Sequence, residues 1–382
     1  MFEIVDQEPN GTVIKVIGVG GAGGNAVEHM MREGVQGVEF ICANTDAQAL
    51  LRSQAQTKLQ LGSTGLGAGA KPDAGRAAAE SAREQIAESL RGAHMVFITA
   101  GMGGGTGTGA APVVAEVARE LGALTVAVVT KPFQFEGRRM RIAEEGLDEL
   151  AKNVDSLIVI LNERLMEVMG DDVSVQEAFR TADNVLRNAV GGIAEIINFP
   201  GLVNVDFEDV RTVMGEMGMA MMGSAFASGV DRARLAAEQA VASPLLEGIH
   251  LSGARGVLVN ITASSSLRMK EVNEVMNTIR AFAAEDAHII FGAVFDESID
   301  DQLRVTVVAT GLGNTRAQNK QPTVQLVQRT GTDNLAIDPG LNFVELDKPA
   351  VFRTRAHATI DALQQSGVDK YDIPAFLRKQ AD

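Results

Sequence analysis

Five glycines and two threonines fill the seven positions from Gly103 to Gly109, and this run constrains the fold more than any other feature. It stands between an apolar segment, 94–99, typical of a buried strand, and a helical pattern at 113–121. Glycine lets a ligand approach the backbone closely, and a helix start offers unpaired N–H groups with a partial positive charge. A flexible surface loop is the alternative, but so many glycines and threonines between a strand and a helix are not the composition of a linker, so the stretch 101–112 predicts a cradle for an anion, most often phosphate.

A second glycine turn, 20–25, follows the first predicted strand, 12–19. The segment 18–23 matches G-x-G-x-x-G, and Asp46 follows the second strand, so an NAD(P)-dependent oxidoreductase is an alternative interpretation. Two glycine cradles on separate strands favour a triphosphate, since a dinucleotide pyrophosphate needs only one. The P-loop pattern G-x-x-x-x-G-K-[ST] does not occur. A nucleotide-binding scaffold without hydrolysis is a third possibility.

Neither glycine turn contains a lysine. Two helix N-termini together supply about one unit of positive charge, which is less than a triphosphate carries in negative charge. We therefore expect a metal ion and a basic side chain to complete the site. Arg138, Arg139 and Arg141 are the local candidates, and a solvated helix face is the alternative for all three.

Strands and helices alternate through the first half of the chain, which predicts a parallel sheet covered on both faces. Ligands bind such sheets at the carboxyl ends of the strands, where the glycine turns fall. The predicted helices are 26–32, 74–90 with Asp73 as a possible cap, and 138–152; further strands are 38–43, 124–129 and 155–161.

The second half begins with one long helix, 175–198, of about 35 Å. A methionine-rich segment, 214–222, predicts flexible core packing. The pattern then predicts helices at 231–242 and 268–284 and strands at 255–262, 288–295 and 303–310, which we interpret as a smaller, mostly β second domain.

Composition excludes several classes of function. A net charge of −15 without basic blocks disfavours nucleic acid as a partner. One cysteine, Cys42, cannot form an internal disulfide, which favours a reducing compartment and a buried structural thiol. We see no secretory signal at the N-terminus and no apolar run of about 18 residues, so direct membrane insertion is not expected.

Several segments together resemble the tubulin/FtsZ family. The run 103–109 is similar to the family's glycine signature, and 131–133, 135–137, 204–207 and 372–377 look like the bacterial branch. The resemblance covers about 12–315 plus the tail and implies an α/β fold with a Rossmann-like parallel sheet, a long central helix and a smaller α+β domain. It also implies a GTPase that binds GTP and GDP with Mg²⁺ and assembles head to tail into the protofilaments of a cell-division ring.

The resemblance carries nucleotide contacts onto this chain. Glu136 matches the ribose-contacting acid, and Asp183 matches the guanine contact, because a carboxylate can accept both the ring N–H and the exocyclic amine. Counting back from 145–146 puts the family's arginine on Arg139, which we favour, whereas counting forward from Glu136 puts Met140 there. The phosphate contacts fall on Gly21, Ala22, Gly23, Gly24, Asn25, Gly103, Gly104, Gly105, Thr106, Gly107 and Thr108.

Two acids follow the long helix, Asp206 and Asp209. The residues alone favour a capping role, with Asp206 as N-cap and Asp209 in the first turn. The resemblance implies instead that this loop enters the nucleotide site of the next subunit, where both acids polarise the attacking water and Asn204 shapes the loop. About 35 Å of helix separates these acids from the glycine turns, so one subunit is not expected to close the site on itself.

The expected domains are an N-terminal tail (1–11), a GTPase domain (12–174), a connecting helix (175–199), a C-terminal α+β domain (200–315), a disordered linker (316–366) and a partner-binding tail (367–382). The linker lies outside the resemblance and is predicted from its polar composition, which has no sustained periodicity. Membrane-tethering and regulatory division proteins are the expected partners of the tail, beside a second copy of the chain. The expected location is cytoplasmic, in a midcell ring on the inner face of the membrane. The expected tail contacts are Asp372, Ile373, Pro374, Phe376 and Leu377.

Overall fold

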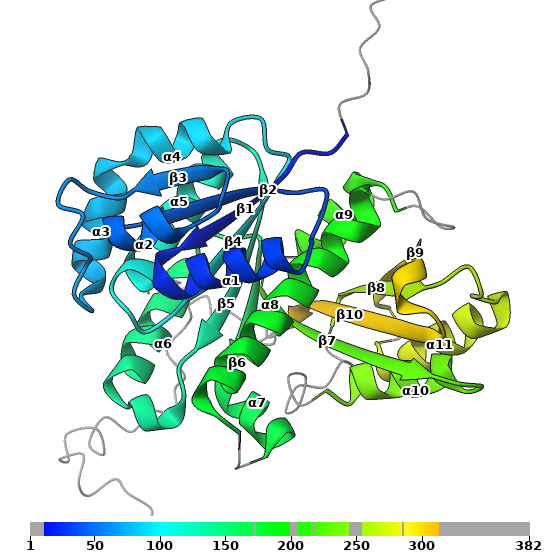
Figure 1. The fold of residues 1–382 in the computed structure, drawn as a ribbon. Coiled ribbons are helices and arrows are strands. Elements are labelled where there is room, and N and C mark those ends of the chain that lie inside the picture. Colours follow the sequence, from blue (N-terminus) through cyan, green and yellow to red (C-terminus); the bar gives the residue numbers. More distant parts are fainter. Residues whose placement is uncertain are drawn as a thin grey trace, which may run out of the picture. The chain divides into compact units, whose positions relative to one another are not determined.

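The computed structural model describes residues 11–170, 173–198, 205–216, 218–243, 254–284 and 286–312, and every structural statement below concerns these. Their strands form one sheet in the order β3-β2-β1-β4-β5-β6-β7-β10-β8-β9 (Figure 1). The strands are β1 Ile14–Val19, β2 Glu39–Asn44, β3 Thr57–Gln60, β4 Met95–Gly101, β5 Leu124–Lys131, β6 Ser156–Leu161, β7 Gly218–Ser228, β8 Gly256–Ala263, β9 His288–Phe295 and β10 Gln302–Leu312.

Strand pairing is parallel from β3 through β7, as the alternating pattern predicted. Among the described strands, only β10 runs antiparallel to its neighbours, β7 and β8, and β9 is the edge strand, parallel to β8. The helices are α1 Gly20–Arg32, α2 Ala47–Arg52, α3 Pro72–Ser81, α4 Arg83–Leu90, α5 Thr106–Glu120, α6 Arg138–Leu150, α7 Asn162–Met169, α8 Val175–Asn198, α9 Phe207–Met214, α10 Arg232–Val241 and α11 Met269–Phe282.

Side chains of successive strand residues point to opposite faces, which divides the core into layers. Ile14 and Val16 of β1 pack beneath α1, α8 and α9. Ile17 and Val19 pack on the other face, against α3, α4, α5 and α6. Farther along the sheet, α10 and α11 cover a third cluster. Both faces are therefore covered, which explains why the strands are continuous apolar runs.

The candidate site lies at the point where the strand order reverses. Strands β1 and β4 are neighbours, and the chain moves outward from them in opposite directions, through α1 to β2 and through α5 to β5. The N-termini of α1 and α5 therefore meet: a Cβ on Gly20 would lie 2.9 Å from the backbone nitrogen of Gly107. This is the topological switch point at which α/β sheets bind ligands.

The glycine turns differ from the prediction. Residues 20–25 form the first turns of α1 rather than a loop, and α5 begins at Thr106 rather than at 113. Helix propensity alone disfavours these glycines, but tertiary packing requires several of them. A Cβ on Gly23 would overlap the carbonyl oxygen of Thr99, and one on Gly109 would overlap that of Pro72 in α3.

Other boundaries also needed the tertiary structure. The predicted helix 74–90 is two helices, α3 and α4, and Asp73 is not its cap, because α3 starts at Pro72 with Lys71 at the N-cap. The short elements β3, α2 and α7 were not predicted. Strand β7 was missed as well, although its buried Met221 and Met222 confirm the predicted core role of the methionine-rich segment.

The long helix is confirmed as α8, Val175–Asn198. It crosses the sheet in front of β5 and β6 and contacts α1 on one side and β8, β9 and β10 on the other (Figure 1). Because β7 pairs with β6, the strands of the second half continue the same sheet. The domain boundaries remain a prediction. Residues 1–10 and 313–382, which include the predicted linker and the predicted tail contacts, lie outside the described residues, and so does Asn204.

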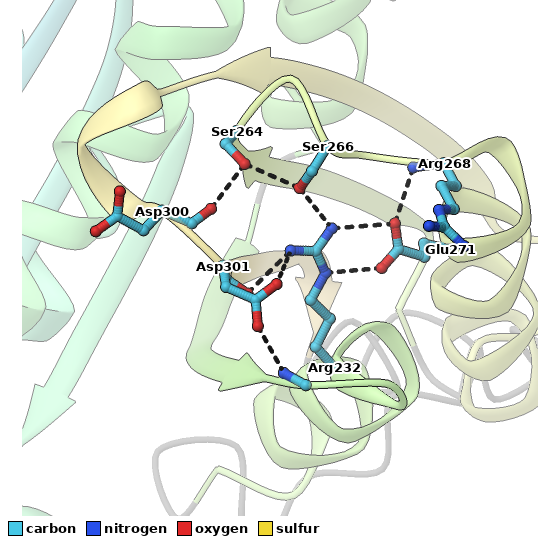
Figure 2. A network of polar contacts seen from close by, with 8 residues as sticks. Arg232, Ser264, Ser266, Arg268, Glu271, Asp300 and Asp301 are labelled. Carbon is cyan, nitrogen blue, oxygen red and sulfur yellow. Dashed lines mark hydrogen bonds and ion pairs between the residues drawn. The ribbon is translucent and has the colours of Figure 1, made fainter.

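A buried arginine joins three elements of the second half (Figure 2). Arg232, at the start of α10, is 4% exposed and donates to both carboxylate oxygens of Glu271 in α11, at 2.7 and 3.2 Å. It also donates to the carbonyl oxygen of Asp301, before β10, and to the hydroxyl of Ser266. Each guanidinium nitrogen has a partner, so this network explains local structure and leaves no donor for a ligand.

Candidate nucleotide site

A cavity of about 240 Å³ opens at the switch point, between the ends of β1, β4, β5 and β6. It is bounded by both predicted glycine segments and by side chains from α6, α7 and α8. Its lining comprises Val19, Gly21, Ala22, Gly101, Met102, Gly104, Gly105, Thr106, Gly107, Thr130, Pro132, Glu136, Arg139, Asn162 and Phe179. A second cavity, of about 590 Å³, adjoins it across Gly21 and Thr106 and includes Gly24, Asn25 and Asp46.

The glycines of the cradle serve two purposes. Added Cβ atoms on Gly103, Gly105 and Gly107 would meet neighbouring protein atoms within 3 Å, so packing requires these glycines. Gly21 and Gly104 have no heavy atom near the Cβ position, and both line the cavity. Gly105 and Gly107 line the cavity too, but of these five glycines only Gly21 and Gly104 have open space at the Cβ position, so a ligand can approach their backbone most closely.

The two threonines of the run also differ. Thr108 is buried, and its hydroxyl accepts a hydrogen bond from the backbone nitrogen of Gly103 at 2.8 Å, so it braces the loop from within. Thr106 lies in the first turn of α5, and its hydroxyl is 2.6 Å from that of Thr45 at the end of β2. Thr106 lines both cavities and Thr108 lines neither.

Neither helix that meets at the cavity has a side-chain cap. The N-cap residues are Val19 for α1 and Gly105 for α5, and neither accepts a bond from its helix through a side chain. The first N–H groups of each helix are then free to bind an anion, and both helix dipoles place positive charge at the same point.

Glu136 and Arg139 lie together on the cavity wall. Glu136 accepts hydrogen bonds from the side chain of Arg139 and from the backbone nitrogen of Phe133. Met140 does not line this cavity, and Arg138 and Arg141 line a separate groove beside Lys71. The structure therefore places Arg139, among these four candidates, beside the cradle.

Asp183 is a half-buried residue of α8 rather than a freely exposed one. Burial raises the pKa of its carboxyl group from 3.8 to about 6, and His29 and Arg32 of α1 oppose part of that rise. Phe179 lies one turn earlier on the same helix and lines the cavity, 48% exposed, with its ring edge-on to Phe133 at 5.7 Å. An apolar ring and a carboxylate thus follow each other along one face of α8.

The lining residues that sequence reasoning missed include Phe179, Asn162 and Thr130. Asn162 is 4% exposed, and its Oδ1 atom has no hydrogen-bond partner among the described residues. Such an orphaned acceptor facing a cavity suits a ligand donor. The available signal was position, because Thr130 lies near the end of β5 and Asn162 directly follows β6.

Asp206 and Asp209 lie near the amino ends of the parallel strands, whereas the cradle lies at their carboxyl ends. Asp206 is the N-cap of α9 and accepts from the backbone nitrogen of Asp209 at 2.8 Å, which confirms the capping prediction. Helix α9 packs at the amino ends of the strands: the ring of Phe207 meets His94, just before β4, at 6.2 Å. Strand β4 ends at the cradle and spans about 20 Å, so the acids and the cradle of one chain cannot meet.

No group of three His, Cys, Asp or Glu side chains is arranged to hold a metal ion within the described ranges. Within the same ranges, no helix is long and apolar enough to cross a bilayer.

The fold and the cradle together define a nucleotide-binding protein of the tubulin-like GTPase class. A family model described as "Tubulin/FtsZ family, GTPase domain" matches residues 13–170, and "FtsZ family, C-terminal domain" matches residues 218–313. The chain belongs to the FtsZ family.

The similarity extends along the whole chain. Proteins named "Cell division protein FtsZ" are 56% identical in Pseudomonas putida and 49% in Neisseria gonorrhoeae, over the full chain and at least 98% of each relative. An FtsZ dimer from M. jannaschii is 42% identical over 81% of this chain and 90% of its own, with a TM-score of 0.77. CetZ2 from Haloferax volcanii, at 20% identity over 80% of this chain and 96% of its own and a TM-score of 0.66, shares the fold.

The protein is therefore a GTP-binding, GTP-hydrolysing cell-division protein of the tubulin-like polymerising class. The oxidoreductase interpretation is wrong, and so is that of a scaffold without hydrolysis.

Proposed function

We propose that GTP is hydrolysed at the junction of two subunits, each of which contributes half of the site. One subunit provides the cradle at the carboxyl ends of β1 and β4, and the next provides Asp206 and Asp209 from near the amino ends of its own strands. The observation that carries this proposal is the separation of the two halves by the length of a strand.

The same separation supports head-to-tail assembly. The half-sites lie at opposite ends of one set of parallel strands, so a shift along the strand direction brings the acids of one copy to the cradle of another. Each added copy exposes a new cradle and a new pair of acids. Such a heterologous contact does not close on itself and generates a filament.

Within one subunit, the N-termini of α1 and α5 bind the phosphates, with Gly21 and Gly104 as the points of closest approach. Asp183 accepts from guanine, Phe179 offers its ring to the base, Glu136 accepts from the ribose, and Arg139 adds positive charge. A bound Mg²⁺ would supply further positive charge against the phosphates. Since no group of three His, Cys, Asp or Glu side chains among the described residues could hold it, the hydroxyl of Thr106 is the side-chain ligand on offer beside the phosphates themselves.

The capping role and the catalytic role are compatible. Asp206 uses Oδ1 to cap α9, which fixes the loop, and its other carboxylate oxygen stays available. Asp209 is exposed in the first turn of the same helix. Both acids can therefore orient and polarise a water molecule on the γ-phosphate of the neighbouring subunit, and Asn204 helps to shape the loop.

Hydrolysis in trans is tested by mixing two inactive variants. Asp209→Ala should bind GTP normally and lose turnover by about 10²-fold or more, whereas Thr106→Ala should lose turnover through its cradle. A mixture should regain phosphate release at junctions that pair an intact cradle with intact acids. Glu208→Gln is the matched control, because Glu208 is a second exposed acid of the same turn. No recovery in mixtures that still form filaments would exclude catalysis across the junction.

We further propose that the tail residues Asp372, Ile373, Pro374, Phe376 and Leu377 bind membrane-tethering and regulatory division proteins. The assembled filaments would then form the cytoplasmic ring at midcell. The motif, apolar anchors beside a proline in a polar terminal stretch, supports this part.

A further inference from the structure

A buried hydrogen bond joins the middle of α8 to α1. His29 of α1 is 4% exposed, and its Nε2 atom lies 2.6 Å from Oδ1 of Asn184. An amide oxygen only accepts, so Nε2 carries the proton and donates. This bond connects residues 155 positions apart in the sequence.

The bond lies between two parts of the nucleotide site. The N-terminus of α1 forms part of the cradle, and His29 lies nine residues beyond Gly20, about 13 Å along the helix. Asn184 directly follows Asp183, and Phe179 lies one turn earlier on α8. Helix α1 therefore fixes how far the phosphate-binding end lies from the base-binding face of α8.

We propose that His29 is a positioning residue for guanine recognition, which holds Asp183 at the correct distance from the cradle through its hydrogen bond to Asn184. The inference deepens the proposed function and rests on the assignment of Asp183 to the base. His29 does not itself touch the nucleotide. A rotation of α8 about its axis would move Asp183 away from the ring N–H and the amine, while the phosphate contacts on α1 and α5 would remain.

The test compares GTP with ITP, whose base keeps the ring N–H but lacks the exocyclic amine. In the unaltered protein, Asp183 accepts from both groups of guanine, so GTP should bind about tenfold or more tightly than ITP. His29→Phe fills the same space without a donor, and it should bring the GTP/ITP affinity ratio close to one. Inorganic tripolyphosphate, which has no base, should bind the variant as it binds the parent.

Three further variants separate positioning from packing. His29→Gln restores a donor of similar reach and should recover most of the affinity ratio. Asn184→Ala should lower the ratio as His29→Phe does, and the double variant should be no worse than either single one. His94→Phe is the matched control, because His94 is an exposed histidine just before the amino end of β4, and this variant should leave the ratio unchanged. Thermal unfolding of each variant reports whether the fold is retained.

The outcomes distinguish this inference from the function on which it rests. If Asp183→Ala abolishes the preference for GTP while His29→Phe and Asn184→Ala keep it, the inference is wrong and the base contact stands. If the unaltered protein does not prefer GTP over ITP, both are wrong. An equal loss of tripolyphosphate affinity in His29→Phe would show general damage to α1 and would also overturn the positioning role.

Discussion

At the scale of single residues, Asp183 combines a cost in stability with a use in binding. Its raised pKa arises mainly from burial, and the positive groups on α1 compensate only in part. A buried carboxylate is retained at such a cost when the charge has a function, and recognition of a base with two adjacent donors is one.

The pH dependence of GTP binding follows from this group. The charged form accepts from guanine, and the pKa in the free protein is about 6. GTP affinity should therefore be flat above pH 7 and fall by up to about tenfold per unit as the pH drops below 6. Titration of GTP affinity between pH 5 and pH 8 measures this, and Asp183→Asn should flatten the profile. An unchanged profile in that variant would assign the pH dependence to another group.

The same residue should have the opposite effect on stability. Its pKa is about 6 in the folded protein and near 3.8 in the unfolded chain, so the folded state binds more protons between those values. The contribution to the unfolding free energy then decreases as the pH rises through that window and is lowest above it. Asp183→Asn should raise the melting temperature at pH 8 while it weakens GTP binding. Asp148→Asn, on the exposed side of α6, is the control without either effect.

At the scale of elements, the glycine-rich helix starts serve packing and binding at once. Helix α5 lies so close to α3 that Gly109 has no room for a side chain, whereas Gly104, just before the helix, faces the cavity. Composition alone cannot separate these cases, because both are glycines of one run.

A pair of substitutions separates them. Gly109→Ala should destabilise the protein by about 1–3 kcal/mol, because α3 and α5 must move apart. Gly104→Ala should leave the unfolding free energy nearly unchanged and lower the affinity for GTP, because the methyl group occupies the space of the phosphates. Denaturant unfolding and nucleotide binding, measured on both variants, check this. A stable Gly109→Ala protein would mean that the helices can separate at little cost.

At the scale of the whole molecule, each chain has a cradle at the carboxyl ends of the parallel strands and two acids near their amino ends. If hydrolysis requires a neighbour, the turnover per subunit must depend on how many subunits have one.

The rate of phosphate release per subunit should therefore rise steeply with protein concentration and then level off as filaments form. Below the concentration of assembly it should approach zero while GTP binding persists. Light scattering and phosphate release, recorded together over a dilution series, test this. A constant rate per subunit at all dilutions would show that one chain closes the site alone.

Much of this organisation follows from local sequence signals. The parallel sheet, the phosphate cradle, the long helix and the N-cap at Asp206 depend on hydrophobic period, on glycine placement and on capping chemistry, all of which act within a few residues. Strand β7 was missed because it is rich in glycine and alanine, which are depleted in strands, and its pairing with β6 and β10 is what makes it a strand.

The sequence by itself thus determined the fold class and the type of site, because periodicity and turn chemistry are properties of neighbouring residues. Only the tertiary structure decided which glycines have open space at the cavity, that Asn162 and Phe179 join its lining, and that His29 meets Asn184 across 155 positions. It also decided that the cradle and the acids lie at opposite ends of the strands. These are distances between elements, and they arise only when the sheet and its helices pack together.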